Sequence, residues 1–157
     1  MVIAGRAMAA IDYTGILSTL ATLLAADSRL AGVRIFVEED PQFGLADQGK
    51  AIVLTLVNRS SSSGQSMSAG KRTRYSVNIG AWSVGFDMAS FNDACIKRDA
   101  VLGALELVLM DNRTISGKVT SAQLEGGEFM SVRRPTEQVY CSMAETVIRA
   151  EASAINT

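Results

Sequence analysis

The sequence predicts an α+β fold, in which an antiparallel or mixed β-sheet carries two helices packed on one face. Two segments place apolar residues at helical spacing, whereas several others alternate polar and apolar residues as strands do. The alternating segments also follow one another through polar connections, which is typical of hairpins in antiparallel sheets. The expected order of elements is α-β-β-β-α-β-β.

The length and composition indicate a single globular domain covering residues 1–157. A domain of about 150 residues buries roughly 68–70% of the surface that its unfolded chain exposes, which is enough for a stable core. The formal net charge of −1 argues against a basic domain that holds nucleic acid through phosphate contacts. No apolar run approaches the roughly 18 residues of a membrane-spanning helix, so no membrane association is expected.

The first helix is expected from Asp12 to Ala26, with one apolar face. That face consists of Tyr13, Ile16, Leu17, Leu20, Leu23 and Leu24. Val33 to Glu38 has the composition of a short strand, and the proline that follows at position 41 cannot extend a strand ladder. Phe43 and Leu45 lie in the otherwise polar loop beyond it.

A long hairpin is expected in the middle of the chain. Ala51 to Val57 is apolar on both faces, as in a central strand that is covered on both sides. Asn58 to Lys71 is rich in serine and glycine, so we expect a flexible hairpin loop there. Arg72 to Ala81 then alternates polar and apolar residues and forms the returning strand.

Beyond Ala81 the alternation of this strand inverts. Trp82, Val84 and Phe86 fall on the face that is polar earlier in the strand. Either a bulge near Gly80 swaps the two faces, or the second half of the strand is covered on the opposite side. In both cases these apolar side chains need a cover, and a second copy of the chain is the expected one.

The second helix is expected to open with a capping box formed by Ser90 and Asp93 and to end near Met110. Its apolar stripe comprises Phe91, Cys95, Leu102, Leu105 and Leu109, widened by Ala94, Val101 and Val108. Another hairpin is expected from the segments Gly117 to Leu124 and Phe129 to Val132. A final long strand follows in residues 139–150, and residues 153–157 are expected to be frayed.

The residues needed for common catalytic sites are missing. The chain contains no histidine, which excludes Ser-His triads and removes the usual zinc ligand and general base. Cys95 and Cys141 are far apart and have no metal-binding spacing, so both are expected to be small buried hydrophobic residues. We therefore expect no catalytic residues, no cofactor and no metal, and a protein that is not an enzyme.

Two acidic segments leave an alternative open. Glu38, Glu39 and Asp40 are three consecutive carboxylates, which either hold a divalent cation or form a solvated strand end. Asp111 either belongs to a catalytic patch with its polar neighbours or lies at a helix C-terminus. A small carboxylate-dependent enzyme or ligand-binding domain is thus the second class of function.

One local basic patch is expected around the hairpin, from Arg59, Lys71, Arg72 and Arg74. It forms either a solvated face or a contact with an acidic partner surface. Tyr75 is the only aromatic residue close to it, so it lacks the interleaved aromatic residues of single-strand nucleic-acid binders.

The order of these elements resembles the tail terminator (tail completion) proteins of long-tailed bacteriophages. The resemblance lies in the first helix with its following strand, the apolar strand, the long third strand, the second helix and the final strand. The corresponding segments are residues 12–37, Ala51–Val57, Arg72–Phe86, 90–119 and 139–150, and Leu109 to Val119 matches that family's helix-to-strand junction.

This resemblance implies a structural virion protein that forms a ring, expected to be a hexamer. Such a ring caps the tail tube at its head-proximal end and joins it to the head after assembly in the host cytoplasm. The implied partners are further copies of the chain, the tail tube protein and a neck or head-completion protein, while DNA passes through without specific binding. A neck or tail tube subunit of the same fold is the alternative. The candidate interface residues are Arg59, Lys71, Arg72, Arg74, Trp82, Val84, Phe86, Phe43 and Leu45.

Overall fold

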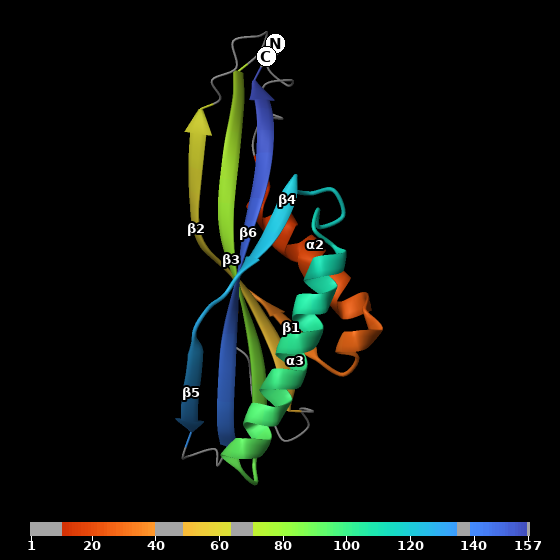
Figure 1. Ribbon diagram of the computed structural model, residues 1–157, viewed down its shortest axis with the longest axis vertical. Coiled ribbons are helices and arrows are strands. Elements are labelled where there is room, and N and C mark those ends of the chain that lie inside the picture. The colour runs from red at the N-terminus through yellow and green to blue at the C-terminus, as the bar shows by residue number, and fades with distance from the viewer. Residues whose placement is uncertain (1–10, 40–48, 64–70, 135–138, 157) are drawn as a thin grey trace.

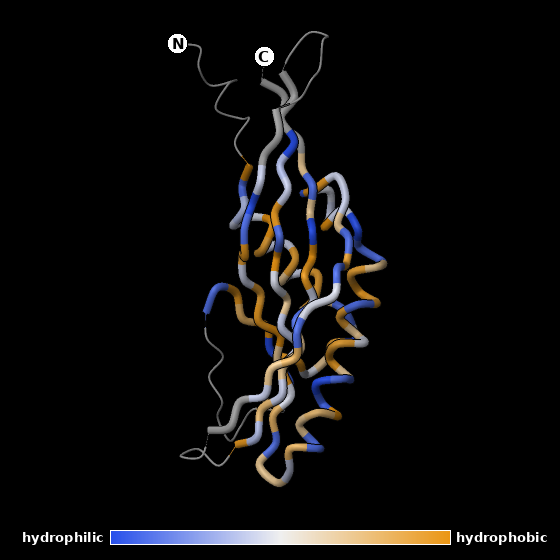
Figure 2. Tube along the Cα trace, turned by 60° about the vertical axis from the view of Figure 1, so that its left-hand side comes forward, coloured by the Kyte–Doolittle hydropathy of each residue, from blue (hydrophilic) through white to orange (hydrophobic). Residues whose placement is uncertain are grey.

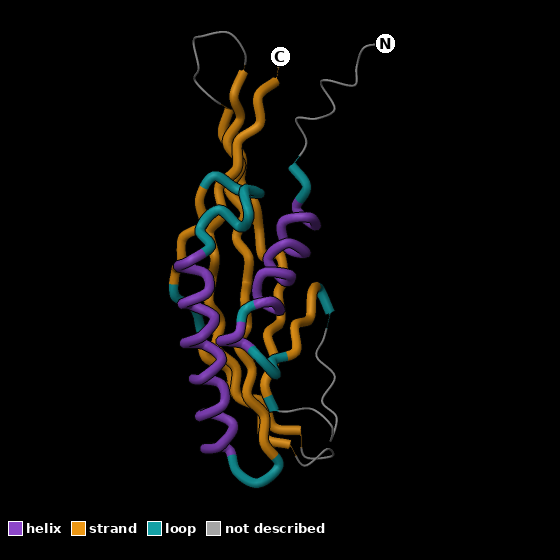
Figure 3. The backbone as a smooth tube through the Cα atoms, turned by 90° about the vertical axis from the view of Figure 1, so that its right-hand side faces the viewer, coloured by secondary structure: helices purple, strands orange, loops and turns teal. Residues whose placement is uncertain are grey.

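The computed structural model describes residues 11–39, 49–63, 71–134 and 139–156. These residues form a mixed six-stranded sheet with two helices on one face, which confirms the predicted α+β class (Figures 1 and 3). The strand order is β1-β2-β3-β6-β4, and β5 also pairs with β6. Three strands follow the second helix, in agreement with the three strand segments expected there, although the order α-β-β-β-α-β-β includes only two of them.

Helix α2 (Tyr13–Ala26) begins at its N-cap Asp12, whose carboxylate accepts a hydrogen bond of 2.9 Å from the Gly15 amide. Four leucine and isoleucine residues of the predicted apolar face are buried, at positions 16, 17, 20 and 24. The helix packs on β1 (Arg34–Val37) and β2 (Lys50–Ser63). Because β1 runs parallel to β2, the sheet is mixed.

Strand β2 is longer than predicted and forms the expected hairpin with β3 (Lys71–Asp87). Residues 58–63, which we expected in the loop, continue β2 and pair with β3 up to the partners Ser63 and Thr73. The backbone makes the hydrogen bonds of a ladder, so a serine run can extend a strand that its neighbour already aligns. The remainder of the expected loop, residues 64–70, lies outside the described residues.

Strand β3 contains no bulge, because it pairs with β6 (Val139–Asn156) without a register shift from Lys71 to Asp87. The hairpin's register shift lies in β2 instead, between Leu56 and Asn58. The inverted alternation therefore reflects a change of cover along β3, the second of the two explanations. Near its start the strand buries one face beneath the helices, and near its end it buries the opposite face as well.

Helix α3 (Phe91–Asp111) starts where the capping signal predicts, with Ser90 Oγ accepting a hydrogen bond of 3.0 Å from the Asp93 amide. The Ser90 amide donates to Asp87 Oδ1 at 3.2 Å, so Asp87 supplies the bond that a capping box assigns to residue 93. The buried face contains Ala94, Val101, Leu105, Val108 and Leu109. Phe91, Cys95 and Leu102 are only half-buried, so the predicted stripe is rotated about the helix axis.

Strands β4 (Ser121–Glu125) and β5 (Phe129–Arg134) do not form the predicted hairpin. Both run antiparallel to β6, one after the other along the same edge. The connecting segment stays beside β6, with hydrogen bonds of 2.8 Å from the Glu145 amide to the Glu128 carbonyl and 3.0 Å from the Val147 amide to the Gly126 carbonyl. Gly127 permits this course, because a Cβ atom there would overlap the backbone of Glu145.

The last strand extends beyond its predicted end. Residues 153–156, which we expected to be frayed, pair with residues 71–74 of β3. Together with the end of β2 they form an arm that projects past both helices at the upper end of Figure 1. The arm is continuous with the rest of the sheet, because each of its three strands, β2, β3 and β6, also runs through the body.

The described residues form two buried apolar clusters, one on each face of the sheet. The larger one lies between the helices and the sheet. The smaller one lies on the other face and contains Phe36, Ala51, Val53, Val84, Phe86 and Cys141. In Figure 2 hydrophobic residues accordingly recur along the central strands as well as along the helices.

Candidate assembly surfaces

The three apolar residues at the end of β3 belong to the smaller cluster. Val84 is 0% exposed and Phe86 is 7% exposed, and Trp82 is half-buried against them. The expectation that this surface is uncovered in a single chain is therefore wrong for Val84 and Phe86. Neighbouring strands contribute apolar residues to the same cluster, and its core residues are buried in a single chain.

The strand register places Arg59 and Arg74, the hairpin arginines whose side chains are described, on opposite faces of the sheet. Arg59 pairs with Val77, which lies on the helix face, and its guanidinium lies 5.9 Å from the Tyr13 ring centroid. Arg74 is exposed and shares its phase with Trp82, so it lies on the opposite face. The bulge after Leu56 shifts the phase of β2 by one residue, so these arginines do not form one patch.

The remaining interface candidates lie at the start of β3 or outside the described residues. Lys71 and Arg72 open strand β3 at the arm, on the side of the hairpin that returns to the body. Phe43 and Leu45 lie outside the residues that the structure describes.

Two of the acidic candidates, Glu38 and Asp111, have structural partners, whereas Asp40 lies outside the described residues. Glu38 accepts hydrogen bonds from the Leu56 amide at 3.2 Å and the Thr55 hydroxyl at 3.0 Å, which fasten the end of β1 to β2. Asp111 forms an ion pair of 2.9 Å with Arg29. Within the described ranges, no group of three or more acidic or cysteine side chains is arranged to hold a metal ion.

A polar layer that the sequence did not predict lies beneath the first half of α3. Ser83 and Ser142 are both fully buried there. Arg98 reaches inward from the helix, donating a 2.7 Å hydrogen bond from Nη1 to Ser142 Oγ and lying 4.8 Å from the Phe129 ring centroid. Small residues at these sheet positions let the helix come close, and Gly85 lies directly under its backbone.

Glu145 lies on the face of the sheet opposite the helices, paired in register with Trp82. Burial, together with the nearby negative charge of Glu128, raises the pKa of its carboxyl group. Neither cysteine forms a disulfide; Cys141 is buried as expected, whereas Cys95 is only half-buried.

Helix α3 carries a second apolar stripe on the side away from the sheet, which we call the outer α3 stripe. It consists of Ile96, Ala100, Gly103, Leu107 and Met110. Ile96, Leu107 and Met110 are 58%, 51% and 52% exposed. In the sequence these residues are spaced by four, three, four and three positions. This pattern is missed when only one apolar face is assigned to the helix.

Both edges of the sheet carry exposed apolar residues among those that the structure describes. At the β5 edge, Phe129 is 68% exposed and Met130 is 46% exposed, and they lie on opposite faces of the strand. At the other edge, β1 pairs with residues 51–54 of β2, and no described strand pairs with the outer side of β2 beyond them. Val57, which is 51% exposed, lies in that open stretch.

The similarity of this chain to known proteins is structural. No protein-family model matches the sequence, and no curated protein matches it. Among solved structures, a chain from the virion of a native gene transfer agent particle is similar, at 14% identity and a TM-score of 0.37. The similarity covers 90% of this chain and 100% of that chain. Among the described helices, none is long and apolar enough to cross a membrane.

Proposed function

We propose that this protein is a non-enzymatic structural subunit of a phage-like virion, and specifically a tail terminator. In this role it forms a ring, expected to be a hexamer, that caps the tail tube and joins it to the head or neck. The order of elements supports the proposal, because a helix, three strands, a second helix and further strands follow one another as the resemblance requires.

The observation that carries the ring is the pair of open sheet edges. The outer side of β2 beyond Leu56 and the outer side of β5 have no pairing strand among the described residues. They lie on opposite sides of one sheet and differ in sequence. Contact between two different edges of successive copies is heterologous, and such contacts form rings when the rotation closes. Unpaired strand edges also template pairing with another chain.

The exposed residues at the β5 edge support the same contact. Phe129 and Met130 expose large apolar side chains on the two faces of an edge strand. A neighbouring strand placed beside β5 covers both side chains and satisfies the outer backbone groups. The smaller apolar cluster plays no part in this contact, because a single chain already buries most of it.

Light scattering after size exclusion, followed by negative-stain imaging, tests the ring. The wild-type chain should form closed rings, and Phe129→Glu should give monomers because it places a charge in the contact. Met88→Glu is the matched control: Met88 is 54% exposed but lies in the turn before α3, away from both edges. A wild-type chain that stays monomeric and does not bind tail tubes would contradict the proposal.

Gene deletion separates the terminator from the alternative roles. A particle without its terminator should make overlong tails, because nothing stops the growth of the tube. A particle without its tube subunit should make no tails, and one without a neck protein should accumulate tails of normal length that are not joined to heads. The tail lengths, measured by electron microscopy, decide among the three.

A further inference from the structure

The outer α3 stripe has the geometry of a helix-packing seam. Its residues recur at alternating intervals of four and three, which is the seam spacing of paired helices. From Ile96 to Met110 the stripe is about 21 Å long at the 1.5 Å rise per residue of an α-helix. It lies opposite the buried residues of the same helix, so α3 has one apolar face for the core and one for another surface.

Gly103, at the middle of the stripe, has no explanation inside the molecule. A Cβ atom added there would meet nothing within 4 Å, so packing within the chain does not require a glycine. Glycine in a helix interior is unfavourable compared with alanine. Together with Ala100, it leaves a shallow site where the backbone of a second helix can come close.

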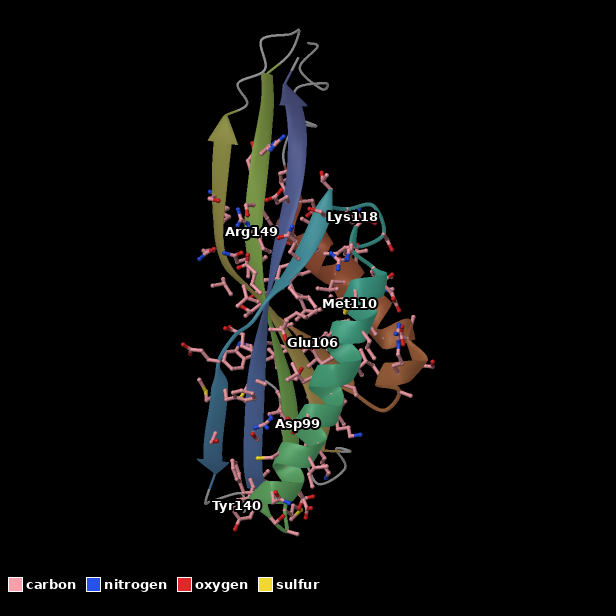
Figure 4. All side chains as sticks on the ribbon, viewed as in Figure 1. Asp99, Glu106, Met110, Lys118, Tyr140 and Arg149 are labelled. Atoms are coloured by element: carbon pink, nitrogen blue, oxygen red, sulfur yellow. The ribbon has the colours of Figure 1, made fainter. Side chains whose placement is uncertain are left out.

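The charges beside the stripe are acidic. Glu106 and Asp99 border it on one side, and Asp93 and Asp111 border it on the other; Figure 4 labels Asp99, Glu106 and Met110 along the helix. The two basic residues of α3 instead bond to the sheet side: Lys97 to Asp87 at 2.9 Å, and Arg98 to Ser142. Arg98 also pairs with Asp99, and Arg29 pairs with Asp111. Asp93 and Glu106 are therefore the border carboxylates that have no ion pair among the described residues.

We propose that the outer α3 stripe is the docking site for one α-helix of a different polypeptide, whose apolar seam is bordered by lysine or arginine residues. The seam spacing specifies a helix, the small central residues specify close approach, and the acidic borders specify basic neighbours. This inference goes beyond the proposed function and does not depend on ring closure, since the stripe lies away from both sheet edges.

A second copy of α3 fits the site less well. In an antiparallel pair of α3 helices that cross at Gly103, Asp99 of one copy lies beside Glu106 of the other. In a parallel pair, Glu106 lies beside Asp111. Both arrangements bring like charges together, which opposes self-pairing.

Synthetic helical peptides test the proposal against the full chain labelled at its isoleucine, leucine and methionine methyl groups. The probe peptide carries three heptads with an Ile/Leu/Ala seam and lysine borders. One control keeps the seam but has glutamate borders, and another keeps the lysines but has glutamine in the seam. We expect the probe to shift the methyl signals of Ile96, Leu107 and Met110, and both controls to bind at least tenfold more weakly.

Substitution in the chain gives the second arm of the experiment. Leu107→Lys should weaken binding of the probe at least tenfold, because it places a charge in the seam and beside the lysine borders. Met88→Lys is the matched control, since Met88 is comparably exposed at 54% but lies in the turn before α3, outside the stripe, and it should leave binding unchanged. Circular dichroism confirms that both variants fold.

Several results would overturn the proposal. Absence of binding by the probe, equal binding by either control peptide, or shifts confined to the sheet would each do so. Self-association that Leu107→Lys abolishes, measured by sedimentation, would identify a second copy as the occupant instead. Ring formation that persists while the peptide fails to bind would reject this inference and leave the proposed function intact.

Discussion

At the scale of single residues, the carboxylate of Asp87 at the end of β3 holds the turn into α3 together. Asp87 accepts hydrogen bonds from Lys97 Nζ at 2.9 Å and from the amides of Ala89 and Ser90 at 2.7 and 3.2 Å. The ammonium of Lys97 and these amides lower the pKa of Asp87 below its ordinary value of 3.8. The ionised form of this residue is thus the one that the folded state favours.

We therefore predict that Asp87→Asn lowers the free energy of unfolding by about 1.5–3 kcal/mol at pH 7, the range for hydrogen bonds to charged groups. A lowered pKa gives a contribution that is present above pH 3.8 and is lost as the pH falls through the native value. The difference between wild type and variant should accordingly shrink below about pH 4. Urea unfolding at a series of pH values measures it.

Asp99→Asn is the control for this prediction. Its carboxylate also pairs with an arginine, at 2.8 Å, but 64% of its side chain is exposed. Exposed pairs contribute little, so this variant should keep nearly wild-type stability at every pH. A constant difference between Asp87→Asn and wild type from pH 7 to pH 2 would show that the loss is not electrostatic.

At the scale of elements, the contact between α3 and the sheet depends on a residue without a side chain. A Cβ atom at Gly85 would overlap backbone atoms of Ala94 and Arg98, which cannot rotate away as a side chain can. The helix approaches this closely because the neighbouring sheet positions also carry small residues, Ser83 and Ser142. Close approach in turn places Arg98 within reach of Ser142.

We predict that Gly85→Ala destabilises the protein by about 1–3 kcal/mol, the usual cost of overpacking a well-packed site. The helix must shift outward, so the signal of Trp82 in near-ultraviolet circular dichroism should change as well. Gly126→Ala is the matched control, because a Cβ atom there meets nothing within 4 Å. Equal stability of the two variants would show that α3 is not seated on Gly85.

At the scale of the whole molecule, the long strands connect a body with two apolar clusters to an arm that extends beyond both. The described buried residues of β3 and β6 nearest the arm are Val77 and Ala150. Beyond them the ladder continues to residues 71 and 156, with half-buried or exposed residues at positions 74–76, 151 and 152. The described residues at the base of the arm are thus less buried than those of the body.

We predict that amide hydrogen exchange in the isolated subunit reflects this boundary. Amides in the part of β3 and β6 that the two apolar clusters cover should exchange at the rate of global unfolding. Amides of the arm should exchange at least tenfold faster, through local opening. Exchange measured by nuclear magnetic resonance, residue by residue, resolves the two groups. Uniform protection along both strands would show that the arm opens only together with the body.

Several features of this protein follow from its sequence alone. The helix caps at Asp12 and Ser90, the buried face of α2, and the hairpin of β2 with β3 are local properties, since a few neighbouring residues determine them. The α+β class follows from the periodicity of apolar residues in successive segments. The spacing of the outer α3 stripe is equally visible in the sequence, although exposure is needed to distinguish it from the buried face.

Only the tertiary structure decided how these segments meet. The alternation at Trp82 allowed two explanations, and the unbroken register with β6 selected one of them. The single-residue bulge after Leu56 separated Arg59 from Arg74, and the shared edge of β6 replaced the predicted hairpin of β4 with β5. Register and strand order depend on contacts between residues far apart in the chain, and local periodicity contains no information about which distant strand supplies the cover.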